Sequence, residues 1–261
     1  MARIKSKTLF ELVKSLNKNE KRYFKIAVSG SKEIDDKKII QLFDYIAALE
    51  KFEDEDVLNK IPHIKTAQLS NLKAYLFEKI LQVLRMYHAS KIPDIQIREQ
   101  IDFAQILFER RLYTQAKRSM DKAKKMAQAN LNLELQLEIL KREKSAVLQN
   151  MGAIDNNVDR LVEEVKLLNA QINNINTFTN FSIKLNSYYT RLGFIRDEQE
   201  DHRIKDFFKT NISTYKENDL STIEKLNLYR LYIGYYFFLQ DFEKGYVYAK
   251  SWKILLTVCP I

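Results

Sequence analysis

The stretch that decides the fold class is residues 104–128, AQILFERRLYTQAKRSMDKAKKMAQ. Apolar and small residues recur in it with the helical period on both sides of a short interruption. This pattern predicts two consecutive helices, about 95–110 and 114–129. Outward from this pair, the same period predicts three further pairs: 131–150 with 155–172, 175–193 with 197–216, and 220–239 with 241–257. We therefore expect an all-α protein.

Candidate N-cap residues mark the second helix of each pair. They are Thr114, Asp155, Asp197 and Asp241, which lie 41, 42 and 44 residues apart. A nearly constant spacing of helix hairpins is typical of a helical-repeat solenoid, in which each pair packs only against its neighbours. Gly152 and Gly193 fall in two of the turns within pairs, where glycine ends a helix at little cost.

The segment 131–139 carries a competing pattern, because its leucines and its isoleucine alternate strictly with polar residues. Alternation alone predicts a strand. We favour a helix, since the segment continues without a break to Asn150 and since Leu, Glu and Gln are good helix formers. A helix this apolar on two sides is expected to lie buried between neighbouring helices.

Residues 104–128 resemble a repeat of the tetratricopeptide family, which places small residues where two antiparallel helices cross closely. The small positions are Ala104, Ala116 and Ala123, and the larger packing residues are Leu107 and Met120. The last pair, GYYFFLQDFEKGYVYAKSW over 234–252, is similar, with Gly234, Gly245 and Ala249 as its small residues.

This resemblance covers about residues 95–258. It implies a tetratricopeptide-like α-solenoid of antiparallel helix hairpins. It also implies that the protein binds peptides or partner proteins, usually along the surface lined by the first helices of the pairs. Catalysis is not implied.

The first 90 residues form a separate prediction. Apolar stripes predict a helix around Leu9–Leu16, a second ending near Ser29, a third over about 36–52 and a long helix over 66–88 with Thr66 as N-cap. The pattern breaks at 89–93. We therefore divide the chain into an N-terminal helical region, 1–90, and a tetratricopeptide-like region of about four helix pairs, 91–261.

Composition excludes several classes of protein. The 261 residues include 5 Gly and 3 Pro, too few for the turns of an all-β chain or for Gly-rich phosphate loops. No apolar run is long enough to span a bilayer, so no membrane span is expected. Cys259 is the only cysteine. An intrachain disulfide is therefore impossible, and the cytoplasm is the expected compartment.

Histidine, cysteine and acidic residues, which serve as metal ligands and catalytic groups, do not occur at the spacings of a known site. His63, His88 and His202 lie far apart without a second ligand at metal-binding spacing. Cys259 has no neighbouring group to activate a thiolate. The acidic run 197–201 opens a predicted helix, where the helix dipole favours acids. We expect no catalytic residue, no metal and no cofactor, and hence a non-enzymatic protein.

A polar stripe in the third pair points to partner binding. Asn180, Lys184 and Arg191 follow the helical period beside an apolar stripe, and Asn227, Tyr229 and Arg230 extend the same surface in the next pair. First helices of tetratricopeptide-like pairs tend to face the groove. These six residues are therefore candidates to hold a peptide backbone or carboxylate, although an ordinary exposed helix gives the same pattern.

The net charge of +9 arises mainly in the first 150 residues. Seven basic residues form a candidate ridge for phosphate or an acidic partner: Arg110, Arg111, Lys117, Arg118, Lys122, Lys124 and Lys125. A ridge of like charge attracts nucleic-acid phosphates, acidic proteins or anionic membrane surfaces. A nucleic-acid-associated protein is thus the alternative to an interaction scaffold, and a solvated helix face is the third interpretation.

Aromatic residues concentrate in the last pair, and the chain finishes on an apolar stretch, 255–261. Solenoids normally end in a polar capping helix. We therefore expect either self-association through this end or a natural polypeptide that continues beyond it.

Overall fold

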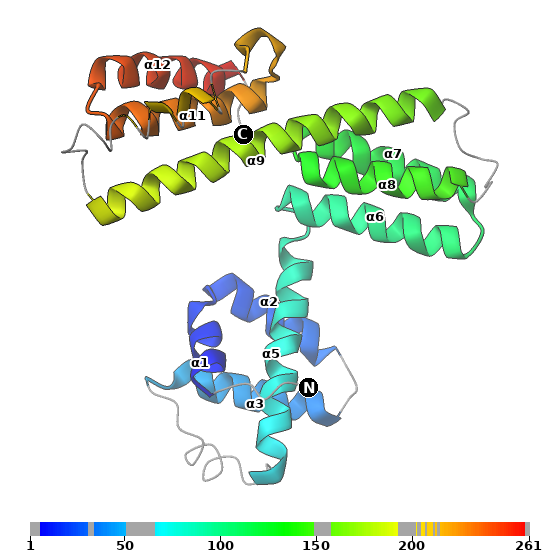
Figure 1. Ribbon diagram of the computed structural model, residues 1–261. Helices are drawn as coiled ribbons and strands as arrows, with labels where there is room; N and C mark the ends of the chain where they lie inside the picture. Colours follow the sequence, from blue (N-terminus) through cyan, green and yellow to red (C-terminus); the bar gives the residue numbers. More distant parts are fainter. Residues whose placement is uncertain are drawn as a thin grey trace. The chain divides into compact units, whose positions relative to one another are not determined.

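A computed structural model describes residues 6–30, 34–50, 66–148, 158–192 and 215–258, together with seven residues between 202 and 212. These residues form helices joined by short turns and contain no strand, which confirms the predicted all-α class (Figure 1). The chain divides into two compact units, Met1–Gln96 and Ile97–Ile261, which we call the N-terminal and C-terminal units.

The N-terminal unit contains four described helices: α1 (Ser6–Ser15), α2 (Lys18–Ser29), α3 (Ile34–Ala48) and α5 (Thr66–His88). Each contributes its apolar stripe to one core, where Leu9, Phe43 and Leu76 are fully buried. The ring of Phe24 lies 4.5 Å from that of Phe43 and connects α2 to α3. The helices predicted around Leu9–Leu16, up to Ser29 and over 66–88 are confirmed, and the third ends at Ala48 instead of near residue 52.

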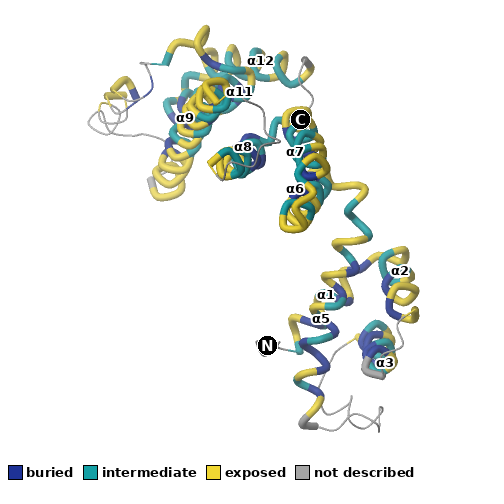
Figure 2. Tube along the Cα trace, turned by 90° about the vertical axis from the view of Figure 1, so that its right-hand side faces the viewer, coloured by how far each residue is buried: buried dark blue, intermediate teal, exposed yellow. Residues whose placement is uncertain are grey.

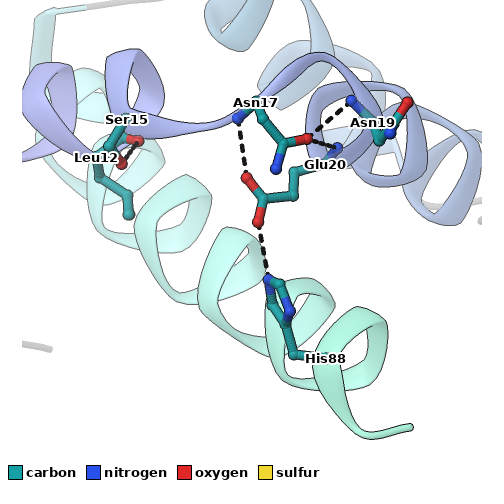
Figure 3. Close-up of polar contacts among 6 residues, drawn as sticks. All are labelled: Leu12, Ser15, Asn17, Asn19, Glu20 and His88. Atoms are coloured by element: carbon teal, nitrogen blue, oxygen red, sulfur yellow. Dashed lines mark hydrogen bonds and ion pairs between the residues drawn. The ribbon is translucent and has the colours of Figure 1, made fainter. Parts of the chain in front are cut away.

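The break between α1 and α2 is stabilised by a capping box (Figure 3). Asn17 Oδ1 accepts hydrogen bonds from the backbone N–H groups of Asn19 and Glu20, at 2.9 and 3.0 Å. Glu20 in return accepts the backbone N–H of Asn17 at 2.9 Å. Its second oxygen lies 2.8 Å from Nε2 of His88, so this carboxylate joins the start of α2 to the end of α5.

The C-terminal unit contains α6 (Pro93–Glu109) from Ile97 onward, followed by α7 (Tyr113–Ala129), α8 (Leu133–Leu148), α9 (Val158–Leu192), a short 3-10 turn (Glu217–Asp219), α11 (Thr222–Phe238) and α12 (Phe242–Val258). Ile97, Ala123 and Ile139 belong to the core shared by α6, α7 and α8. The bounds of α6, α7, α11 and α12 lie within two residues of those predicted from the sequence.

Helix α8 is the segment whose alternating pattern resembles a strand, and its helical prediction is confirmed. Leu135 and Ile139 pack toward α6 and α7, whereas Leu133 and Leu140 pack toward α9. The helix thus buries two sides at once, which explains a sequence with few exposed apolar positions. Asn132 caps it by accepting the backbone N–H of Leu135 at 3.0 Å.

Helix α9 contradicts the predicted break between 155–172 and 175–193, because it runs as one helix of 35 residues. Ile172 and Ile175 both pack against the cluster formed with α8, so the helix continues without a turn. The Asn174 side chain donates to Glu224 at 2.7 Å instead of ending the helix. The predicted second and third pairs therefore share one helix, which lies beside α8 at its start and beside α11 at its end (Figure 1).

Three turns between consecutive helices have the same backbone geometry. Arg111, Leu131 and Gln240 adopt positive φ values of 61°, 52° and 58°. In each turn the next residue donates its N–H to the carbonyl five residues back, as in Asn132 to Ala127 at 3.0 Å, which is a Schellman motif. Glycine is the usual residue there, so these turns carry no glycine signal in the sequence.

The predicted N-caps have different outcomes. Asp241 is confirmed, since its Oδ1 accepts the backbone N–H of Lys244 at 3.2 Å. Thr114 is wrong, because the cap position of α7 is Leu112, which supplies no side-chain hydrogen bond. Asp155 and Asp197 lie outside the described residues, as do Gly152 and Gly193.

A candidate ligand pocket among helices α6 to α9

A pocket of about 380 Å³ lies where helices α6, α7, α8 and α9 meet. Alanines from three of these helices line it, Ala104, Ala116 and Ala146, and their short side chains leave space between the helices. Phe108 and Tyr113 line it beside the α6–α7 turn, with ring centroids 5.4 Å apart in an edge-to-face arrangement. Two of the alanines are the small positions of the tetratricopeptide resemblance.

One lysine and two glutamates form an ion cluster in the pocket. Lys124 Nζ lies 2.8 Å from Glu164 on α9 and 3.5 Å from Glu143 on α8. The side chains of Lys124 and Glu143 are each about one-fifth exposed, at 20% and 21%. Burial raises the pKa of Glu143 above its ordinary value, and the nearby Glu164 and Asp121 carboxylates raise it further against the effect of Lys124. This cluster already satisfies Lys124.

Other basic side chains surround this cluster. Arg142 donates to Gln105 at 3.1 Å and pairs with Glu138 at 3.1 Å. Lys117 is half-buried and Lys125 is exposed, and no described residue forms an ion pair with either. With Lys124, Arg142 and Arg160, five cationic side chains line the pocket against Asp121, Glu143 and Glu164, which gives a net charge of +2.

The predicted basic ridge is therefore divided by the fold. Lys117, Lys124 and Lys125 line the pocket. Arg110 and Arg111 are exposed at the α6–α7 turn, and Arg118 and Lys122 are exposed on α7 outside the pocket. The sequence reasoning missed Arg142, Glu143, Arg160 and Glu164, which come from helices later in the chain. No local spacing signals them, because only the packing of α8 and α9 against α7 brings them together.

The predicted groove residues on α9 and α11 do not line this pocket. Asn180, Lys184 and Arg191 are exposed along α9. Lys184 Nζ lies 5.8 Å from the centroid of the Phe181 ring. Arg230 is exposed on α11, and Asn227 bonds to the Ile223 carbonyl of its own helix at 2.8 Å.

Tyr229, the sixth groove candidate, belongs to a stack of tyrosines between α11 and α12. The rings of Tyr232 and Tyr248 are stacked with centroids 4.4 Å apart, and Tyr236 lies 5.7 Å from Tyr248. Tyr229 donates its hydroxyl to Glu217 at 2.8 Å. Burial raises the pKa of Tyr229 and of Tyr232 to about 12, and the hydrogen bond to Glu217 also raises the pKa of Tyr229.

The last helix pair keeps part of its aromatic surface outside the stack. Phe242 and Tyr246 on α12 are 58% and 72% exposed. Phe237 bridges from Phe242 to Tyr189 of α9, with ring centroids 6.0 and 5.9 Å apart. Self-association through the apolar end of the chain stays a prediction, and we expect these exposed rings to form part of such an interface.

The histidines, the cysteine and the acidic run considered in the sequence analysis form no reactive site among the described residues, and several of them lie outside those residues. His88 bonds to Glu20, and His202 is exposed. His63, Cys259 and residues 197–201 are outside the described ranges. Among the residues that the structure describes, no three His, Cys, Asp or Glu side chains are grouped to hold a metal. No helix in the same residues is long and apolar enough to cross a membrane.

Comparisons with protein-family models, with curated proteins and with solved structures returned no match for this chain. The pocket therefore has to be interpreted from its own geometry and charge.

Proposed function

We propose that this protein is a non-enzymatic interaction scaffold of the cytoplasm that binds a peptide segment of a partner protein. The observation that carries the proposal is the pocket of about 380 Å³ among α6, α7, α8 and α9. Antiparallel hairpins joined by repeated turns support a tetratricopeptide-like arrangement, in which such surfaces bind peptides. In this proposal the solenoid is irregular because α9 is continuous, and the binding site lies nearer its beginning than the groove predicted on α9 and α11.

The dimensions of the pocket suit an extended peptide. Its lining follows one side of α7 from Tyr113 to Gln128, which corresponds to about 22 Å of helix at 1.5 Å per residue. An extended chain rises by about 3.3 Å per residue, so about six or seven residues would cover this length. Apolar alanines beside charged side chains provide both burial and orientation, which is the usual composition of a ligand site.

The proposal is tested by selecting peptides from a displayed random library on the purified full chain. We expect selected peptides to lose at least tenfold in affinity for Ala146→Leu, because the larger side chain fills the pocket. The matched control is Ser145→Leu, since Ser145 is the preceding residue of α8 and is exposed. Peptides that bind both variants as tightly as the wild type, or a selection that yields no binder, would contradict the proposal.

Nucleic-acid binding is the second candidate function. Residues 110–125 contain seven basic residues and one acid, Asp121, and that acid lies in the pocket. Arg110, Arg111, Arg118 and Lys122 thus remain as an exposed basic surface. Fluorescence anisotropy with labelled DNA and RNA at low and physiological salt tests this function. Affinity should fall steeply with salt if phosphates are bound, and Arg118→Glu should weaken it further.

A further inference from the structure

We infer that the partner segment bound in the pocket is acidic and extended, with two carboxylates four residues apart that pair with Lys117 and Lys125. An apolar side chain midway between them would lie against Met120 and the alanines. This inference rests on the proposed function and adds the chemistry of the partner. It uses only residues that line the pocket.

The sign of the partner follows from the charges of the lining. Five cationic and three acidic side chains line the pocket, so an anionic segment enters a site of net charge +2. The whole chain carries +9, which also steers an acidic segment toward the protein. A basic segment would be repelled both by the whole chain as it approaches and by the pocket lining when it binds.

The internal pairing selects which lysines are available. Lys124 is engaged by Glu164 at 2.8 Å and by Glu143 at 3.5 Å. Arg142 is engaged by Glu138 and Gln105. Lys117 and Lys125 have no ion-pair partner among the described residues, so a ligand carboxylate can approach them without breaking an existing pair.

The spacing follows from helix geometry. Lys117 and Lys125 are eight residues apart on α7, which places them about 12 Å apart along the helix axis at 1.5 Å per residue. In an extended segment, residues i and i+4 are about 13 Å apart and point to the same side, as does residue i+2. Asp121 lies between the two lysines on α7, so an acid at i+2 would be repelled and an apolar residue favoured.

The probe is a fluorescein-labelled peptide, Gly-Gly-Glu-Ser-Leu-Ser-Glu-amide, titrated with the full chain in anisotropy measurements at low and physiological salt. A permuted peptide, Gly-Gly-Glu-Ser-Glu-Ser-Leu-amide, has the same composition and charge but places its carboxylates two residues apart. We expect the first peptide to bind about three- to tenfold more tightly than the second, since only its spacing reaches both lysines.

Variants of the protein test the two contacts. Lys117→Gln and Lys125→Gln should each weaken binding about two- to fivefold, as expected for partly exposed ion pairs. Lys122→Gln is the matched control, because it removes the same charge from the exposed surface of α7 outside the pocket. The variants should keep the wild-type circular dichroism spectrum, since none of the three lysines is fully buried.

Equal binding of the two peptides, or equal effects of all three lysine variants, would overturn the inference. Its failure is distinguishable from failure of the proposed function. If library peptides bind and are lost in Ala146→Leu but are neutral or basic, the scaffold function stands and the acidic partner is wrong. If neither library peptides nor the acidic probe bind, both are wrong.

Discussion

The two units bury their apolar side chains in different ways. In the N-terminal unit, α1, α2, α3 and α5 share a single core. In the C-terminal unit the described core falls into three clusters, which lie among α6–α8, between α8 and α9, and between α9 and α11. Figure 2 shows the contrast, since buried residues recur along the whole of α3 whereas α9 has long exposed stretches. A divided core leaves space between its parts, and the pocket occupies such a space.

The largest expected loss of stability comes from truncating a buried phenylalanine. It tests whether the N-terminal unit has one cooperative core and the C-terminal unit has several. Phe43→Ala should destabilise the N-terminal unit by about 3–5 kcal/mol, as for other fully buried phenylalanines. Phe178→Ala should have a similar effect, but one confined to the second half of α9 and its neighbours α11 and α12. Hydrogen exchange on the full chain measures both. If Phe178→Ala lowered protection in α6–α8 as much as in α11, the three clusters would form one cooperative core.

The junction of two clusters in the C-terminal unit depends on a buried carboxylate. Glu224 is 3% exposed, caps α11 through Ser221 and accepts the Asn174 side chain of α9. Glu224→Ala should destabilise the unit by about 3 kcal/mol, because a cap and a buried hydrogen bond are lost together. Urea unfolding gives the value. The exposed Glu243→Ala is the control and should change stability by less than about 0.5 kcal/mol.

Turn geometry also separates the units. Left-handed residues other than glycine occur in three turns of the C-terminal unit and at no described position of the N-terminal unit. Gln240→Gly should stabilise the protein by about 0.5–1 kcal/mol, since a left-handed side chain costs about 1–2 kcal/mol and glycine offsets part of this through its flexible unfolded state. Gln82→Gly, in the middle of α5, should destabilise by about 1 kcal/mol. Thermal melts that changed in the same direction for both would contradict this.

The smallest expected effects on stability come from the ionisation of Glu20 and Glu143, and they have opposite signs in the two units. The backbone hydrogen bond from Asn17, with help from His88 and Lys91, holds the pKa of Glu20 below its ordinary value. Glu20 therefore adds stability that is fully present above its unfolded pKa and is lost as the pH falls through its lower, folded pKa. Burial raises the pKa of Glu143, so stability is highest below its unfolded pKa and is lost as the pH rises through its higher, folded pKa. At neutral pH, Glu20→Gln should lower stability and Glu143→Gln should raise it.

Stability measured by urea unfolding at pH 3 and pH 7 checks this pair of variants. Both differences from the wild type should shrink at pH 3, where the carboxylates of the folded and unfolded states approach the same protonation. A Glu143→Gln variant that is less stable than the wild type at pH 7 would mean that its ion pair with Lys124 outweighs its burial.

The sequence predicted the helices well where one apolar stripe faces one core. Leu9, Phe43 and Leu76 lie on such stripes, and all three are buried as expected. The continuous α9 could not be predicted in the same way, because its apolar side changes partner midway and Asn174 bonds to a residue 50 positions later. The pocket was only partly predictable. Local spacing identified Lys117 and Lys124, but Glu164 lies 40 residues from the lysine that it contacts.

Helix α9 packs against α8 in its first half and against α11 in its second half, which restricts where residues can be inserted or deleted. A single inserted residue in the middle of the helix would rotate everything after it by about 100° around the axis, because a turn contains 3.6 residues. Phe178, Phe181 and Leu185 would then no longer face α11, although Leu168 would still face α8. Homologous chains could therefore differ by substitution at the exposed positions of α9. Insertions and deletions would be confined to positions outside this helix.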